Sequence, residues 1–218
     1  MDTSSWKDKY VDQLSILELA YAHLGNAGSY TVKGGILKSI LPITLQEINH
    51  ARYMEYSKNF VPVVSAFGVV EQIGFTYKRT DMIEFSNPKA SSINKALYYF
   101  AGFEEGNEDV KALYALRNSF LHNASLLAKA LHQNKPSYYF QFDRQIDALV
   151  KYPDVAWNGD ISTFKPQYTT LINPEKVIDL AKIIVDSALG CLQSGVLEVD
   201  LEFGEKELFY RFLKLYTD

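Results

Sequence analysis

The chain has 218 residues, of which 47% are hydrophobic and 22% charged, a balance typical of a globular protein with one well-filled core. Its formal net charge of −4 argues against a protein that coats nucleic acid, because phosphate binding normally needs a basic field. A local basic cleft is still compatible with this charge. Cys191 is the only cysteine, which excludes an intrachain disulfide and a thiolate metal cluster.

The sequence contains no targeting or membrane signal that we can identify. Its first ten residues, MDTSSWKDKY, lack the basic segment and apolar run of a secretory signal. No stretch approaches eighteen continuous apolar residues. We therefore expect a cytoplasmic protein that does not enter a membrane.

Apolar residues recur at intervals of three and four through most of the first 134 residues, which is the spacing of amphipathic helices. Loops are expected at 28–35 and 78–92, where glycine, proline and serine gather. Short links between helices favour antiparallel packing. The sequence therefore predicts an all-α fold, an antiparallel bundle of four to five helices. The expected helices before the central one cover 6–24, 44–56, 60–77 and 93–103, with a short one at 36–41.

The central helix of this bundle is expected over 106–134. Asn107 can cap its start, and two acidic residues follow where the helix dipole favours them. Apolar residues continue at helical spacing as far as Leu131, and Pro136 prevents the helix from running further. One stripe of this helix should lie in the core.

The sequence changes character after Pro136. Residues 138–142 and 168–172 are rich in aromatic and β-branched residues, so they predict a small β-hairpin. Asn173 and Pro174 then open a helix that should end near Gly195. A strand from Val196 and a short helix over 205–216 complete the tail. Because no flexible linker separates the parts, we expect one domain over 1–218, with a bundle at 1–134 and a C-terminal extension at 135–218.

The hexapeptide Arg117–His122, RNSFLH, is the one place where the sequence offers chemistry. Asn118 and His122 are four residues apart and share a helix face, and the long side chain of Arg117 can reach the same patch. Arginine offers paired donors to phosphate oxygens, and histidine exchanges protons near neutral pH. These types in this spacing therefore suit a phosphate.

Glu71 is the one acid within a strongly apolar helix. A carboxylate in such surroundings needs a partner, and Arg117 is the most economical candidate. That pairing would be a structural tie, or it would hold Arg117 in place for a ligand. The plainer interpretation of the hexapeptide is a surface arginine and a structural histidine, since such residues usually serve these roles.

The segment LRNSFLHNASLL resembles the signature of HEPN domains, in which an arginine precedes a histidine by four to six intervening residues, often with a polar residue after the arginine. Arg117, Asn118 and His122 match those three positions at the shortest spacing. The resemblance covers roughly residues 5 to 134, although only the hexapeptide is specific. It implies a small helical bundle that dimerises so that two motifs line one cleft.

Many proteins with this signature are metal-independent ribonucleases, and others only bind RNA or nucleotide. The resemblance implies that His122 moves a proton, Arg117 stabilises phosphoryl charge and Asn118 orients either group, without a cofactor. The partners it suggests are RNA and a second copy of the chain, with an antitoxin or a nucleotidyltransferase as a further partner in a toxin role.

Other chemistries find no support. The histidines show no metal-ligand spacing, and no serine or cysteine lies in a recognisable nucleophile turn. Three hypotheses stay open: a metal-independent endoribonuclease, a non-catalytic module that binds RNA, nucleotide or protein, and a dimer-packing device in which Arg117 and His122 bridge chains or bind Glu71.

Overall fold

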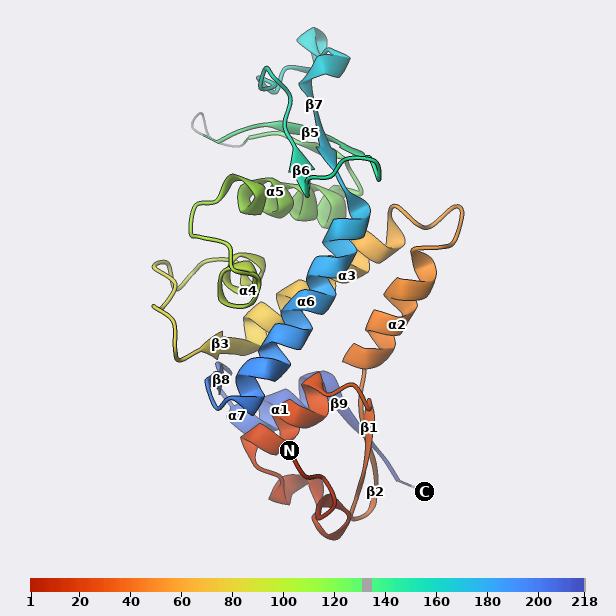
Figure 1. The fold of residues 1–218 in the computed structure, drawn as a ribbon, viewed down its shortest axis with the longest axis vertical. Helices are drawn as coiled ribbons and strands as arrows, with labels where there is room; N and C mark the ends of the chain where they lie inside the picture. The colour runs from red at the N-terminus through yellow and green to blue at the C-terminus, as the bar shows by residue number, and fades with distance from the viewer. Residues whose placement is uncertain (131–134, 218) are drawn as a thin grey trace.

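The computed structural model describes residues 1–130 and 135–217 (Figure 1). Within those ranges the chain forms seven α-helices and nine strands, and the strands make three sheets. The fold is therefore mixed α/β, and the prediction of an all-α bundle is wrong. Local helical periodicity misses the sheets because most of their strand pairs join segments far apart in the sequence.

The helices supply most of the core. In Figure 1, α6 runs alongside α3 through the middle of the molecule, and buried residues from the whole length of the chain join one hydrophobic cluster. No helix of the described residues is long and apolar enough to cross a bilayer. The helices are α1 (Ile16–Leu24), α2 (Leu41–Ala51), α3 (Val61–Thr76), α4 (Ser92–Ala101), α5 (Glu108–Asn123), α6 (Pro174–Gln193) and α7 (Gly204–Phe212).

The N-terminal segment is helical in a different way from the prediction. Residues 6–13 form two short 3-10 turns, and α1 begins only at Ile16. Ser15 caps the start of α1: its hydroxyl accepts from the Glu18 amide while the Glu18 carboxylate accepts from the Ser15 amide, which is a capping box. The expected single helix over 6–24 is therefore wrong in its first half.

A three-stranded sheet joins the two ends of the chain. Strands β1 (Ser29–Val32) and β2 (Gly35–Ser39) form a hairpin, and β9 (Leu213–Tyr216) adds to β2 in antiparallel register. The sequence predicted a loop at 28–35, a helix at 36–41 and a helix through to 216. All three predictions fail at these residues. Strands β1 and β2 form a local hairpin, and β9, the second partner of β2, lies more than 170 positions further along the chain.

A four-stranded mixed sheet covers α5 in Figure 1. Its order is β4-β5-β7-β6, and β5 pairs with β7 in parallel. The prediction that 138–142 and 168–172 form strands is therefore correct, but they are not a hairpin because parallel strands need a crossover. The strands are β4 (Leu127–Ala128), β5 (Tyr138–Phe142), β6 (Val150–Lys151) and β7 (Thr169–Ile172).

One strand of the remaining pair, β8, matches the expected strand after Val196, whereas β3 lies where the sequence predicted the end of a helix and the start of a loop. Strand β3 (Tyr77–Arg79) follows α3 directly and pairs in antiparallel register with β8 (Leu197–Val199), which follows α6. The C-terminal extension is therefore larger than a hairpin and a helix, and two of its strands, β8 and β9, pair with strands from the first half of the chain.

Candidate functional site

Helix α5 carries the hexapeptide, and local signals set where it begins. Asn107 caps it, with Oδ1 accepting from the backbone amides of Asp109 at 2.8 Å and Val110 at 3.3 Å. One face of the helix is buried in the core, and it includes Val110, Leu113, Leu116 and Phe120. The beginning and the buried stripe agree with the prediction.

The helix ends much earlier than predicted. Ala124 has a φ of 49°, a left-handed conformation that ends α5 at Asn123. Leu127 and Ala128 then pair with Tyr139 and Tyr138 of β5, so strand pairing overrides the helical spacing of the sequence. His122 therefore lies in the last turn of α5. The expected continuation over 131–134 lies outside the described residues.

Arg117 is held by two oxygen atoms. Its Nη2 donates to Glu71 Oε2 at 2.6 Å, and its Nη1 donates to Asn118 Oδ1 at 2.8 Å. The side chains of Arg117 and Glu71 are 20% and 23% exposed, so this ion pair between α5 and α3 is shielded from water for most of its surface. The pairing that we expected for Glu71 is present.

The hydrogen bonds and the charge of the Arg117 guanidinium are both accounted for by its neighbours. Its Nε is buried and has no hydrogen-bond partner among the described atoms. The two terminal nitrogens therefore make all of its polar contacts, and the carboxylate of Glu71 neutralises its charge. A phosphate at this site would share the guanidinium with Glu71.

His122 stands apart from this cluster. Its side chain is exposed, and no hydrogen bond or ion pair among the described residues joins it to Arg117 or Asn118. Asn118 and His122 still share a helix face, one turn apart. The structure thus brings together Arg117, Asn118 and Glu71, and it leaves the exposed His122 without a polar partner among residues 1–130 and 135–217.

A cavity of about 480 Å³ opens beside the same ion pair. Glu71 belongs to both the cavity and the ion pair, because it lines the cavity and one of its oxygens accepts a hydrogen bond from Arg117. Helix α3 contributes one face to the wall, and the start of α4, the end of α7 and Ile40, just before α2, contribute the rest. The lining residues are Ile40, Gly68, Glu71, Gln72, Phe75, Ser92, Arg211 and Phe212.

A buried polar chain lies behind this cavity. Gln72 Nε2 donates to His23 Nε2 at 2.9 Å, so the ring proton lies on Nδ1, which is 2.7 Å from the Tyr77 hydroxyl. Phe212 stacks on the His23 ring with centroids 4.9 Å apart. Burial lowers the pKa of His23 to about 3, so the ring is neutral at pH 7.

The sequence alone did not indicate this chain of hydrogen bonds. His23 lies in the last turn of α1, where a histidine commonly serves the helix dipole, and Tyr77 is 54 positions away. The one available signal was Gln72, a polar residue beside Glu71 on an otherwise apolar helix. Two adjacent polar residues on such a helix indicate a polar site.

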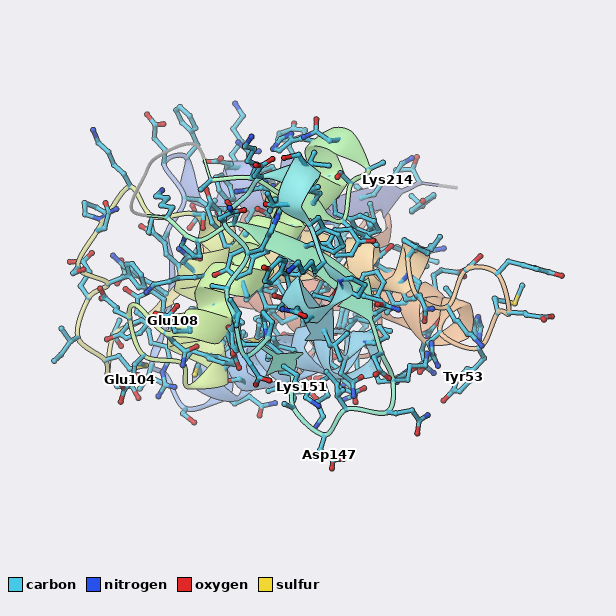
Figure 2. All side chains as sticks on the ribbon, turned by 90° about the horizontal axis from the view of Figure 1, so that it is seen from above. Tyr53, Glu104, Glu108, Asp147, Lys151 and Lys214 are labelled. Atoms are coloured by element: carbon cyan, nitrogen blue, oxygen red, sulfur yellow. The ribbon has the colours of Figure 1, made fainter. Side chains whose placement is uncertain are left out.

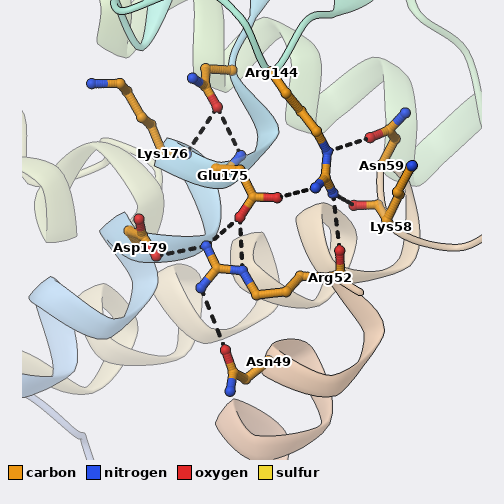
Figure 3. A network of polar contacts seen from close by, with 9 residues as sticks. Asn49, Arg52, Lys58, Asn59, Arg144, Glu175, Lys176 and Asp179 are labelled. Carbon is orange, nitrogen blue, oxygen red and sulfur yellow. Dashed lines mark hydrogen bonds and ion pairs between the residues drawn. The ribbon is translucent and has the colours of Figure 1, made fainter. Parts of the chain in front are cut away.

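A second polar network joins the end of α2, the segment just before α3, the segment after β5 and the start of α6 (Figure 3). Arg144 donates to Glu175 at 2.5 Å and to the backbone oxygens of Arg52 and Lys58, and Arg52 also donates to Glu175 and to Asp179. Every guanidinium nitrogen of both arginines has a partner. This network therefore ties the segment after β5 to α2 and α6 through oxygen atoms of the protein itself.

Comparisons with known proteins found no matching family model, no matching curated protein and no matching solved structure. No group of three or more histidine, cysteine, aspartate or glutamate residues within the described parts of the chain could hold a metal ion. The candidate site is therefore defined by its own geometry, namely the ion-paired Arg117, the exposed His122 and the cavity that shares Glu71.

Proposed function

We propose that this chain is a HEPN-like, metal-independent endoribonuclease that cuts RNA at a cleft between two copies of the chain. The observation that carries the proposal is the fixed guanidinium of Arg117. Glu71 and Asn118 orient it from two sides on the helix that also presents the exposed His122. An oriented guanidinium and a free imidazole on one helix are the groups that phosphodiester cleavage needs.

The chemistry uses the 2′-hydroxyl of the RNA as nucleophile. One His122 removes the 2′ proton while the 2′ oxygen attacks phosphorus, and the bond from phosphorus to the 5′ oxygen breaks. A second His122, from the other copy, gives a proton to the leaving 5′ oxygen. The products are a 2′,3′-cyclic phosphate and a 5′-hydroxyl, and all atoms and protons balance without a cofactor.

Arg117 stabilises the negative charge that builds on the phosphoryl oxygens. The amide oxygen of Asn118 accepts a hydrogen bond from Arg117. The amide nitrogen of Asn118 can therefore donate to a phosphate oxygen or to His122. Glu71 is a positioning residue, because it binds the Arg117 guanidinium and does not itself touch the RNA in this mechanism. Each copy supplies one histidine, so the reaction needs two copies.

The chain offers matched controls for the test. His50 is also an exposed histidine in the last turn of a helix, α2, and Arg79 is also a partly exposed arginine paired with an acid, Asp81. We expect His122→Ala and Arg117→Ala to abolish cleavage of total RNA, and His50→Ala and Arg79→Ala to retain it. Cleavage that survives in His122→Ala would refute the proposal.

One observation favours a second candidate, a non-catalytic module that binds RNA, nucleotide or a protein partner. Glu71 already neutralises Arg117, and the chain as a whole is acidic. In that case the purified protein binds RNA in a gel-shift or polarisation assay and leaves it intact. Arg117→Ala would then weaken binding, while His122→Ala would change it little.

A further inference from the structure

We propose that the outer face of the three-stranded sheet is a platform that binds single-stranded RNA. The choice of RNA as the ligand rests on the proposed function, but the surface is separate from the hexapeptide. In Figure 1 this sheet lies at the lower end of the molecule, whereas α5 lies in the upper half. The residues of this face, which we call the sheet platform, are Ser29, Thr31, Ile36, Lys38, Lys214 and Tyr216.

The strand pattern separates the two faces of this sheet. Val32, Leu37 and Leu213 are buried and belong to the hydrophobic core, so they define the inner face. Side chains alternate along a strand, so the residues between them point away from the core. Five of the six residues of the sheet platform are exposed, and the sixth, Lys38, is half-buried. This face is therefore open to solvent.

Two lysines lie directly opposite each other on the sheet platform. Lys38 of β2 is in register with Lys214 of β9, and neither forms an ion pair or a side-chain hydrogen bond with a described residue. Like charges at directly opposite positions of neighbouring strands destabilise a sheet. No residue of the sheet platform is acidic, although the chain as a whole carries a net charge of −4. A bound anion would relieve the repulsion between the two lysines.

Tyr216 adds an aromatic surface beside both lysines. The Nζ atoms of Lys38 and Lys214 lie 4.6 and 5.2 Å from the centre of its ring. Tyr216 is 46% exposed, and Ile36, which is directly opposite it on β2, is 41% exposed. The sheet platform therefore presents a ring and an apolar side chain next to two positive charges.

This combination fits a single nucleic-acid strand better than a duplex or an acidic peptide. The bases of a single strand are free to stack on an exposed aromatic ring while the lysines bind neighbouring phosphates. The bases of a duplex are already stacked on each other, so only its backbone could reach the lysines. An acidic peptide would use the lysines and leave the ring of Tyr216 without a role.

Fluorescence polarisation with the full chain tests the proposal. The probe is a labelled 2′-O-methyl oligouridine of about ten nucleotides, the length that one such surface typically covers. The proposed reaction cannot cut this probe, because it has no free 2′-hydroxyl. We expect it to bind about tenfold more tightly than a duplex of the same length and chemistry. Equal binding of the duplex, or no binding of the single strand at about 0.1 mM protein, would overturn the proposal.

Charge reversal locates the binding surface. Lys38→Glu and Lys214→Glu should each weaken binding about tenfold, because each removes a phosphate contact and adds a repulsive charge. Each should also keep or raise the urea midpoint, because it replaces a like-charged pair by an ion pair across the strands. The control is Lys151→Glu, which makes the same charge change at an exposed lysine of β6, in the upper half of Figure 1. Equal binding by Lys38→Glu and Lys151→Glu would overturn the proposal.

Two substitutions of Tyr216 test the role of its ring. Tyr216→Leu removes the aromatic surface and should weaken binding by at least about fivefold, whereas Tyr216→Phe keeps the ring and should bind like the wild type. If a lysine variant fails to fold, this pair decides. Binding by Tyr216→Leu that equals that of Tyr216→Phe would show that no base stacks there, which contradicts the proposal.

The same measurements separate the sheet platform from the cleavage chemistry. Binding that depends on Lys38 and Tyr216, in a protein that cuts no RNA, would support the sheet platform and refute the proposed cleavage. Cleavage by a protein whose RNA binding is the same in every sheet variant would support the cleavage and refute the sheet platform.

Discussion

Arg117 Nη2 lies 2.6 Å from Glu71 Oε2, and this ion pair connects α5 to α3 at the point where the candidate site meets the cavity. Both side chains are about four-fifths buried, so the pair lies between a surface salt bridge and a fully buried one. Its two members therefore affect stability as well as the orientation of the guanidinium.

The first prediction concerns the strength of this pair. In a double-mutant cycle with Glu71→Gln and Arg117→Gln, we expect a coupling energy of about 1–2 kcal/mol by urea unfolding, between the values for exposed and buried pairs. The Lys182 and Asp186 pair on α6 is more exposed and serves as the control. Its coupling should be about 0.3–0.5 kcal/mol. Equal couplings would show that burial adds nothing to the Arg117 pair.

The second prediction concerns pH. Burial lowers the pKa of His23 to about 3, against 6.5 for an ordinary histidine. Between these values the unfolded chain binds a proton that the folded chain does not, so the free energy of unfolding falls as the pH falls from about 6.5 towards 3. At pH 5 this loss should be about 2 kcal/mol relative to pH 8.

Urea unfolding at pH 8 and pH 5 measures this effect. His23→Gln should remove that part of the pH dependence, whereas His50→Gln, which replaces an exposed histidine, should keep it. The prediction fails if the wild type and His23→Gln lose the same stability between the two pH values.

The third prediction concerns the crossing of α3 and α4. A Cβ on Gly74 would lie 1.9 Å from the Ser92 backbone oxygen and 2.8 Å from the Ala96 Cβ, so the two helices would have to separate. Gly74→Ala should destabilise the protein by about 3 kcal/mol, because such overpacking forces the backbone to shift. Gly68→Ala on the same helix meets nothing and should stabilise by up to about 1 kcal/mol. Thermal unfolding of both variants checks the contrast, and similar melting temperatures would contradict it.

The fourth prediction concerns the end of α5. Ala124 adopts a φ of 49°, which costs an L-residue with a Cβ about 1 kcal/mol relative to glycine. Ala124→Gly should therefore raise the free energy of unfolding by about 0.5–1 kcal/mol. Ala115→Gly, in the interior of the same helix, should lower it by about 1 kcal/mol. A loss of stability in Ala124→Gly would show that the left-handed turn is not strained.

Local signals explain which elements the sequence predicts well. Helix α6 follows from Asn173 and Pro174 at its start and Gly195 just after its end, and all of these act within a few residues. The Glu71 pairing followed from the cost of an unpaired carboxylate on an apolar helix. Both inferences depend on local signals, namely capping residues and a charged residue on an apolar helix, that can be recognised within one segment of the sequence.

Non-local pairing explains most of the failures. Strand β2 has one of its two partners at the far end of the chain, and β5 pairs in parallel with β7 across a long crossover. Residues after Ala124 keep a helical spacing of apolar side chains, yet Leu127 and Ala128 pair with β5. The sequence did not indicate the cavity either, because its lining comes from α3, α4, α7 and the residue before α2.

The exposure of aromatic residues between α2 and α3 was also not predicted from the sequence. The connection between α2 and α3 carries apolar side chains that are open to solvent, and Figure 2 shows Tyr53 there, on the opposite side of the molecule from Glu104 and Glu108. The sequence predicted a helix through to residue 56, whereas α2 ends at Ala51. The sequence therefore placed the aromatic residues of this connection within an amphipathic helix. In the structure they lie beyond the helix, and the most exposed of them, Tyr56, is 93% exposed.

Analysis of the RNA ends after cleavage is the decisive test of the proposed reaction. Purified wild type, His122→Ala and His50→Ala are incubated with a defined single-stranded RNA in the presence of a metal chelator, and the product ends are identified by mass spectrometry. We expect the wild type and His50→Ala to produce 2′,3′-cyclic phosphate and 5′-hydroxyl ends, and His122→Ala to leave the RNA intact. Intact RNA with the wild type, or the same ends with His122→Ala, would contradict the proposed role of the Arg117–His122 hexapeptide.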